Sequence, residues 1–118
     1  MNSDKASCIF CKILSGVAPA TVVHRDDQVT AFRDVHPIAR THILIIPNRH
    51  IVSVNELEAG DELLIGHMVM VAKELAARQG VAEDGYRLMI NTGVHGGQTI
   101  PHLHLHLIAG KLARFLMG

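Results

Sequence analysis

Three histidines alternate with leucines near the C-terminal end of this chain, in the run His102-Leu103-His104-Leu105-His106. Successive side chains of a β-strand point to opposite faces, so we expect a strand with all three imidazoles on one face and the leucines packed beneath it. Imidazole has an unperturbed pKa of about 6.5, so it can act as a base, a nucleophile or a metal ligand near neutral pH. Two kinds of chemistry are therefore open: a shared metal ion, or a histidine nucleophile whose neighbours bind an anionic substrate.

A glycine-rich segment, Gly96-Gly97-Gln98-Thr99, precedes this strand. Its glycines let backbone N–H groups approach an oxyanion, and the Gln98 and Thr99 side chains add hydrogen-bond donors. A hydrolytic metal site usually includes a nearby carboxylate, and no acidic residue lies close to these histidines in the sequence. The combination favours phosphoryl transfer, while a metal-dependent hydrolase that uses the three histidines as ligands remains an alternative.

Cys8 and Cys11 are the two cysteines of the chain and lie three residues apart. This spacing excludes a disulfide framework across the fold and leaves a metal half-site, a redox pair or two free thiols. Lys12 interrupts the apolar stretch near the N-terminus, which argues against a secretion signal, and no apolar run approaches the roughly 20 residues of a membrane span. We therefore expect a cytoplasmic protein with no membrane partner.

Composition limits the kinds of partner further. The 118 residues include 11 basic and 11 acidic side chains, and 48% of them are hydrophobic. The length and the lack of repeats or linkers predict a single domain over residues 1–118. A formal net charge of zero argues against nucleic acid as a partner.

Short strands and one long helix are the elements that must position the histidines. Apolar or β-branched runs predict five strands, at residues 21–25, 29–32, 42–46, 86–91 and 103–109. We expect Ser7 to cap a short helix at 8–14, and Asp61 to cap a long helix that ends at Gly80. Four apolar residues at helical spacing predict its buried face: Leu64, Met68, Val71 and Leu75. Together these elements predict an α+β domain with an antiparallel sheet.

The run 102–108 resembles the signature of the histidine triad (HIT) family, in which histidines alternate with hydrophobic residues. Five further segments occur in the order typical of its nucleotide-binding branch: 8–13, 31–34, 41–47, 91–93 and 96–98. The resemblance covers nearly the whole chain and implies the HIT fold. Arg40 departs from the proline that is common before the 41–47 segment, which puts the geometry of that loop in question.

In this family the middle histidine attacks the α-phosphate of a nucleotide, and water then hydrolyses the covalent nucleotidyl-histidine. The resemblance implies that His104 is the nucleophile, that His106 contacts the phosphate and helps to protonate the leaving group, and that His42 completes the cluster. It also implies four phosphate-binding residues: Asn91, Gly97, Gln98 and Thr99. Thr99 keeps the hydroxyl of the serine that often occupies this position and adds a methyl group.

The resemblance also implies how a nucleoside is held. Asp34 corresponds to the acid that binds the ribose hydroxyls, and Ile9, Phe10 and Val35 correspond to the apolar walls of the base pocket. The implied activity is hydrolysis or nucleotidyl transfer at the α-phosphate of purine nucleoside phosphoramidates or related adenylates. The alternatives are a dinucleoside polyphosphate hydrolase and a zinc-stabilised nucleotide-binding module with little turnover.

Some members of the family hold a structural zinc ion through a cysteine pair and two histidines. Cys8, Cys11, His50 and His102 match those positions, and no catalytic metal is implied. The family resemblance also implies a homodimer, for which the apolar tail 115–118 is a candidate contact. Four histidines receive no role from the motif: His24, His36, His67 and His95.

Overall fold

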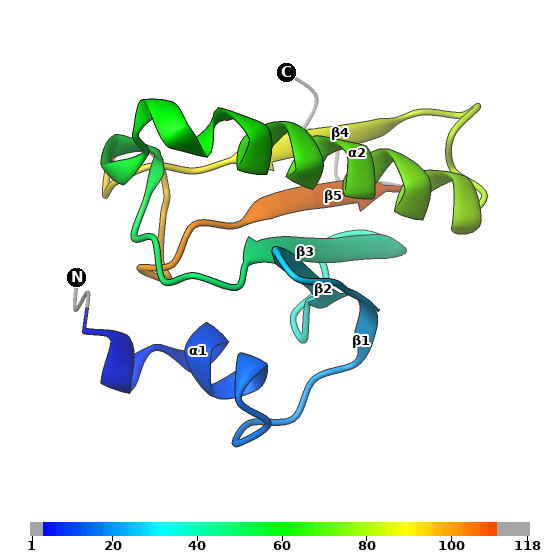
Figure 1. Ribbon diagram of the computed structural model, residues 1–118. Coiled ribbons are helices and arrows are strands. Elements are labelled where there is room, and N and C mark those ends of the chain that lie inside the picture. The colour runs from blue at the N-terminus through cyan, green and yellow to red at the C-terminus, as the bar shows by residue number, and fades with distance from the viewer. Residues whose placement is uncertain (1–3, 111–118) are drawn as a thin grey trace.

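The structure is a computed structural model in which residues 4–110 are described. Five strands form one antiparallel sheet in the order β1-β2-β3-β5-β4. The strands are β1 (Val22–Arg25), β2 (Val29–Arg33), β3 (Thr41–Pro47), β4 (Tyr86–Ile90) and β5 (Leu105–Ala109). The helix α1 (Ile9–Leu14) and the long helix α2 (Glu62–Arg78) complete the predicted α+β fold (Figure 1).

The central strand β3 separates two apolar clusters, because its side chains alternate between the faces of the sheet. Ile43 and Ile45 are fully buried and pack in the cluster that includes α2. Leu44 and Ile46 point to the opposite face and pack in the cluster that includes Phe10 of α1. The helix α1 therefore covers the face of the sheet that carries His42, while α2 covers the other face.

Helix α2 joins β3 to β4 and packs on the sheet through the predicted stripe. Met68, Val71 and Leu75 are buried, and Leu64 packs against the same cluster from a partly exposed position. Asp61 is the N-cap residue of this helix, as predicted, but its side chain makes no capping hydrogen bond to α2. Its carboxylate instead accepts a hydrogen bond from the backbone of Glu58 and pairs with Arg49.

The prediction that Ser7 caps the first helix is wrong, because Ser7 belongs to the preceding 3-10 turn Lys5–Ser7. Cys8 is the N-cap, and its Sγ atom accepts a hydrogen bond from the Cys11 N–H at 3.4 Å. A cysteine thus replaces the oxygen-bearing residue usual at this position. The start of α1 consequently orients both thiols.

Strand β5 is shorter than the 103–109 run predicts, since it begins at Leu105. His102 and His104 lie in the segment just before it, and Leu103, Leu105 and Leu107 all pack in the α2 cluster. The leucines thus occupy the predicted face even where the strand hydrogen bonds have not begun. Among the described residues no helix is long and apolar enough to cross a membrane.

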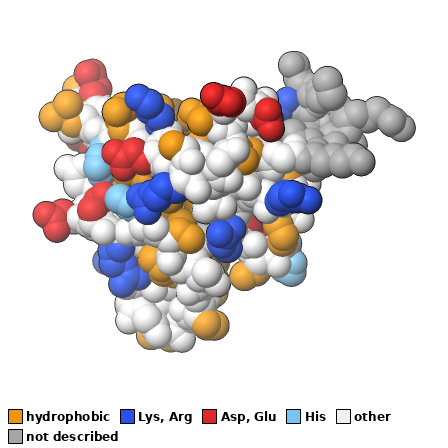
Figure 2. Space-filling model, turned by 90° about the vertical axis from the view of Figure 1, so that its right-hand side faces the viewer, with side chains coloured by type: hydrophobic (Ala, Val, Ile, Leu, Met, Phe, Trp, Pro, Cys, Tyr) orange, Lys and Arg blue, Asp and Glu red, His pale blue; other side chains and the backbone are white. Residues whose placement is uncertain are grey.

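The surface seen in Figure 2 carries acidic and basic side chains interspersed with apolar ones, in agreement with the balanced composition. No large area of one charge is visible on this face (Figure 2). A broad electrostatic attraction for a polyanion is therefore not provided by this side of the molecule.

Candidate active site

The pairing of β3 with β5 brings three histidines together on the face covered by α1. His106 lies opposite Leu44 in the register, and His42 lies opposite Ile108. The Nε2 atom of His42 is 2.9 Å from Nδ1 of His106, and the rings of His104 and His106 have centroids 4.9 Å apart. The predicted imidazole cluster is therefore formed by two neighbouring strands and the residue just before one of them.

Hydrogen bonds determine which ring nitrogen carries the proton in two of these histidines. Nδ1 of His104 lies 2.7 Å from the carbonyl oxygen of His102, which can only accept, so Nδ1 is the protonated nitrogen and Nε2 keeps its lone pair. The backbone N–H of Ile38 donates to Nδ1 of His42 at 3.2 Å. His42 in its neutral form therefore carries its proton on Nε2. This N–H donates a hydrogen bond to Nδ1 of His106.

Burial keeps these imidazoles neutral near pH 7. It lowers the pKa of His104 and of His42, although the Asp34 carboxylate acts in the opposite direction on both. Burial, together with the neighbouring His104 and His42, lowers the pKa of His106 to about 4. A neutral His104 has the free lone pair that a nucleophile requires.

The three histidines line a cavity of about 630 Å³, which is large enough for a nucleotide-sized ligand. Several of its walls are the residues expected from the sequence: Ile9, Phe10, Asp34, Val35 and Thr99. The rings of Phe10 and His104 pack in a T-shaped arrangement, with centroids 5.2 Å apart. The cavity thus combines a polar end formed by histidines with apolar walls supplied largely by α1.

Asp34 lies at the polar end of the cavity, directly after β2. Its Oδ2 atom is 3.4 Å from Nε2 of His42, and its side chain remains 20% exposed. Its Oδ1 atom accepts a hydrogen bond from the His36 N–H at 2.9 Å, which fixes the orientation of the carboxylate. The second oxygen is thus directed towards the histidine cluster while staying accessible to solvent.

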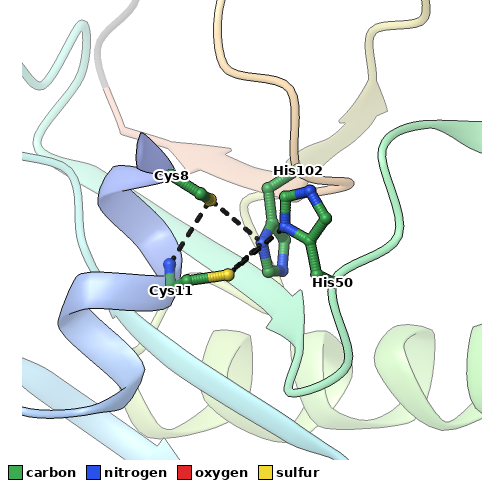
Figure 3. Close-up of side chains that lie close together, drawn as sticks. All are labelled: Cys8, Cys11, His50 and His102. Atoms are coloured by element: carbon green, nitrogen blue, oxygen red, sulfur yellow. Dashed lines mark hydrogen bonds between the residues drawn. The ribbon is translucent and has the colours of Figure 1, made fainter. Parts of the chain in front are cut away.

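A second group of side chains gathers beside the first, at the start of α1 (Figure 3). Nδ1 of His102 lies 3.4 Å from Sγ of Cys8 and 3.7 Å from Sγ of Cys11. Nδ1 of His50 lies 3.2 Å from Sγ of Cys11. All four donor atoms lie within 4.8 Å of one another, so the four residues matched by the motif do converge on one point.

The chemistry of these four donors fits a tetrahedral metal site. Zinc with Zn–S bonds of about 2.3 Å and Zn–N bonds of about 2.0–2.1 Å places sulfur and nitrogen ligands roughly 3.5 Å apart, close to the spacing seen here. His102 is completely buried, and its Nε2 lies 2.9 Å from the Pro47 carbonyl, which leaves Nδ1 free to bind an ion. Cys8, Cys11, His50 and His102 could therefore hold zinc with no position left for a substrate.

The chain is similar to known proteins in both sequence and structure. The family described as "Scavenger mRNA decapping enzyme C-term binding" matches residues 7–116. The purine nucleoside phosphoramidase of Escherichia coli (strain K12) is 52% identical over 103 residues, which cover 87% of this chain and 87% of that protein. A solved HIT family hydrolase from Legionella pneumophila Philadelphia 1 is 45% identical, with a TM-score of 0.89, and the match covers 95% of this chain and 100% of that chain. The chain belongs to the histidine triad family.

A further solved member of the HIT family bears on the cluster of cysteines and histidines. It is a zinc-bound histidine triad family protein from Mycobacterium smegmatis, 33% identical and with a TM-score of 0.79. The match covers 92% of this chain and 78% of that chain. Metal binding thus occurs within the family to which this chain belongs.

The loop between β4 and β5 of this HIT protein is held by its own polar side chains. The Gln98 amide donates to the carbonyls of Val52 and Ile100, and its oxygen accepts from the Gly93 N–H. Both amide hydrogens of Gln98 are therefore engaged, and none is left for a phosphate in this conformation. Asn91 likewise donates to the loop through the Gly96 carbonyl at 2.7 Å.

Of the four residues expected to bind phosphate, Thr99 lines the cavity, while Asn91, Gly97 and Gln98 do not. Gly97 has a φ angle of +83°, which favours glycine, and it lies next to the Asn91 side chain. These three residues thus shape the loop that carries Thr99. Their effect on the cavity is indirect in this structure.

Other cavity residues were missed in the sequence. Phe32, Leu44 and Ile38 line it, as do His36, Met89 and Ile100. Phe32 and Leu44 share the face of the sheet with His42, so the alternation along the two strands was the signal that could have revealed them. Ile38 lies in a loop and donates its backbone N–H to His42. No residue pattern in the sequence indicates this contact.

Proposed function

We propose that this chain is a purine nucleoside phosphoramidase that breaks a phosphorus–nitrogen bond through a covalent intermediate on His104. The observation that carries this proposal is the hydrogen bond from His104 Nδ1 to the His102 carbonyl. It leaves Nε2 as the nucleophilic atom of a ring that lines the cavity. A relative 52% identical to this chain bears the name of the same activity.

The first step forms a bond between His104 Nε2 and the α-phosphorus and breaks the phosphorus–nitrogen bond. The departing amine takes up one proton, which His106 is placed to supply. His106 is neutral in the ligand-free protein, but an anionic phosphate beside it raises its pKa because opposite charges favour the imidazolium form. Water then attacks phosphorus and gives one proton to His106, which lost its own in the first step. The Nε2–phosphorus bond breaks, and a nucleoside monophosphate leaves neutral His104 behind.

The remaining site residues receive roles that follow from their positions. Asp34 binds the ribose hydroxyls through its accessible oxygen, and Ile9, Phe10 and Val35 contact the purine. The Thr99 hydroxyl donates to the phosphate. The loop residues Asn91, Gly97 and Gln98 hold Thr99 and the nearby backbone N–H groups in place, as their hydrogen bonds indicate.

Zinc is proposed as a structural ion held by Cys8, Cys11, His50 and His102. The four donors leave no open position, so the ion would stabilise the protein and orient His102 without taking part in catalysis. Two free thiols positioned as metal ligands also support a reducing, cytoplasmic location.

We also propose a homodimer, in which the exposed side of α2 contributes to the contact between the two chains. Leu63 is 85% exposed and Met70 is 52% exposed, which leaves a long helix with apolar side chains facing solvent. The predicted contribution of residues 115–118 falls outside the described residues. We expect light scattering during gel filtration to give twice the mass of one chain, and the Leu63→Glu/Met70→Glu variant to elute as a monomer. A wild-type protein that stays monomeric at high concentration would refute this proposal.

The decisive test of the catalytic proposal compares His104→Ala with His95→Ala, which removes an exposed histidine outside the cavity. With adenosine 5′-phosphoramidate as substrate, we expect kcat to fall by roughly 10³-fold or more in His104→Ala and to stay unchanged in the control. Unchanged turnover in His104→Ala would exclude a covalent intermediate on this residue.

The same assay separates the alternative functions. A dinucleoside polyphosphate hydrolase would give the higher kcat/KM with diadenosine polyphosphate, and a binding module would turn over neither substrate. A metal-dependent hydrolase would lose activity as soon as a chelator is added. We expect the phosphoramidate to be preferred and turnover to survive brief chelation.

A further inference from the structure

Outside the catalytic cavity, His24, Asp26 and His67 form a second compact group of potential metal ligands. His24 lies on β1, Asp26 follows in the turn to β2, and His67 lies on α2. The Nε2 atoms of the two histidines are 2.6 Å and 2.7 Å from the same oxygen, Asp26 Oδ2. The three donor atoms lie within 4.8 Å of one another, so two imidazoles and one carboxylate converge on a single point.

The carboxylate of Asp26 is held rigidly by the turn around it. Its Oδ1 atom accepts hydrogen bonds from the backbone N–H groups of Gln28 at 2.8 Å and Val29 at 2.9 Å. The Asn48 side chain binds the Asp26 carbonyl at 2.8 Å and fixes the backbone. Only Oδ2 is therefore directed at the histidines, as in carboxylates that are oriented by hydrogen bonds for metal binding.

The Asp26 carboxylate is ionised, and the cluster is open to solvent. Burial alone raises the pKa of Asp26, but hydrogen bonds from His24, from the turn backbone and from His67 together hold it well below its usual range. The side chains of His24, Asp26 and His67 are 18%, 29% and 37% exposed, respectively. None of the three lines the catalytic cavity, so a ligand can reach this group without entering that site.

We propose that His24, Asp26 and His67 bind a divalent transition-metal ion such as Ni²⁺, Cu²⁺ or Zn²⁺ at a site separate from the Cys8/Cys11/His50/His102 cluster. Two imidazoles and a carboxylate suit these ions, whereas Mg²⁺ and Ca²⁺ prefer oxygen ligands. Three protein ligands leave at least one coordination position for water or an external group. The ion would connect the turn after β1 to α2.

Binding requires only a small rearrangement. Ligand atoms around such an ion lie roughly 3.3 Å apart, so the two Nε2 atoms must move away from Oδ2 by several tenths of an ångström. The partly exposed His67 side chain on α2 can rotate by this amount. A neutral imidazole with its proton on Nδ1 has a lone pair on Nε2, which is the atom that would bind the ion.

The experiment uses protein whose four-residue site has first been filled with one equivalent of Zn²⁺, as checked by elemental analysis. Titration with Ni²⁺ in a calorimeter is expected to show one further ion bound per chain. His67→Gln and His24→Gln should weaken this binding at least about tenfold, because the glutamine amide can still donate to Asp26 but is a poor metal ligand. His95→Gln, a control at an exposed position outside the cluster, should bind Ni²⁺ like the wild type.

Nuclear magnetic resonance locates the ion independently of affinity. Paramagnetic Ni²⁺ should first broaden the amide signals of Gln28, Val29 and His67, and circular dichroism should confirm that the variants are folded. Equal Ni²⁺ affinity in His67→Gln would place the ion elsewhere, for example at Asp34 and His42, and would overturn the proposal. Absence of any further Ni²⁺ in the wild type would also overturn it and leave the cluster as a hydrogen-bonded contact between α2 and the turn.

Discussion

At the scale of single residues, the backbone group that contacts each histidine determines what the ring can do. The carbonyl of His102 accepts from His104 and leaves a lone pair on the distal nitrogen, whereas the Ile38 N–H donates to His42 and leaves a proton there. The Pro47 carbonyl similarly contacts Nε2 of His102, so Nδ1 of this ring faces the cluster of cysteines and histidines. Backbone contacts alone thus make one imidazole suited to nucleophilic attack, a second to hydrogen-bond donation and a third to metal binding.

The half-buried ring of His106 predicts that the protein loses stability in mild acid. In the folded chain its pKa is about 4. Burial and the neighbouring His104 and His42 lower this pKa, and Asp34 acts in the opposite direction. The unfolded chain has a histidine pKa of about 6.5 and so binds the proton first as the pH falls. The stabilising contribution is therefore complete above pH 6.5 and decreases as the pH falls towards 4.

The measurement is the free energy of unfolding in urea at pH 7 and pH 5, for wild type and His106→Gln. We expect the decrease between the two pH values to be smaller in the variant, which lacks the titrating ring. Proton competition at the Cys8/Cys11/His50/His102 cluster affects both proteins alike and cancels in the comparison. An equal decrease in both would contradict the assignment of this acid sensitivity to His106.

At the scale of elements, the alternation of residue types predicted which side chains lie on which face of the sheet. Strand limits and contacts made by loop backbone atoms were not predicted. The period of two in the 102–108 run placed the leucines against α2 and the histidines on the other face correctly. The sequence did not predict that β5 begins only at Leu105, because strand limits depend on the partner strands β3 and β4. The roles of Ile38 and Pro47 come from a backbone N–H and a backbone carbonyl, which nearly all residue types supply, so the sequence does not indicate them.

The alternation along β3 predicts different effects for two adjacent substitutions. Leu44 lines the cavity and Ile45 packs in the α2 cluster, and both are buried. Leu44→Ala and Ile45→Ala should each lower the free energy of unfolding by roughly 2–5 kcal/mol, as expected for a cavity created in a packed interior. Only Leu44→Ala should also raise KM for the nucleotide, since it alone removes part of the cavity wall.

Urea unfolding and steady-state kinetics on the two variants measure these effects side by side. Ile45→Ala serves as the matched control, because it loses a side chain of the same volume from the opposite face of the same strand. A KM that rises equally in both variants would mean that the cavity responds to general loss of stability. The face of the sheet would then have no special role in nucleotide binding.

At the scale of the whole molecule, the cluster of cysteines and histidines joins segments that are distant in sequence. The contact between Cys8 and His102 spans 94 positions of the chain, and that between Cys11 and His50 spans 39. Phe10, between the two cysteines, makes T-shaped ring contacts with both His102 and His104. A metal ion at the cluster would therefore fix the helix that forms one wall of the cavity. Through the His102 carbonyl it would also orient His104, the proposed nucleophile.

Removal of the proposed zinc ion should accordingly lower thermal stability and weaken substrate binding. Free zinc at about 100 times its dissociation constant stabilises a folded protein by about 2.7 kcal/mol. At this chain length, about 1 kcal/mol changes Tm by roughly 4 °C, so prolonged chelation should lower Tm by roughly 10 °C. KM should rise as α1 loosens, and the Cys8→Ser/Cys11→Ser variant should start from the lower Tm and not respond to chelator. A wild-type Tm that is insensitive to chelator, or a double variant that responds equally, would exclude zinc at these four residues as the stabilising ion.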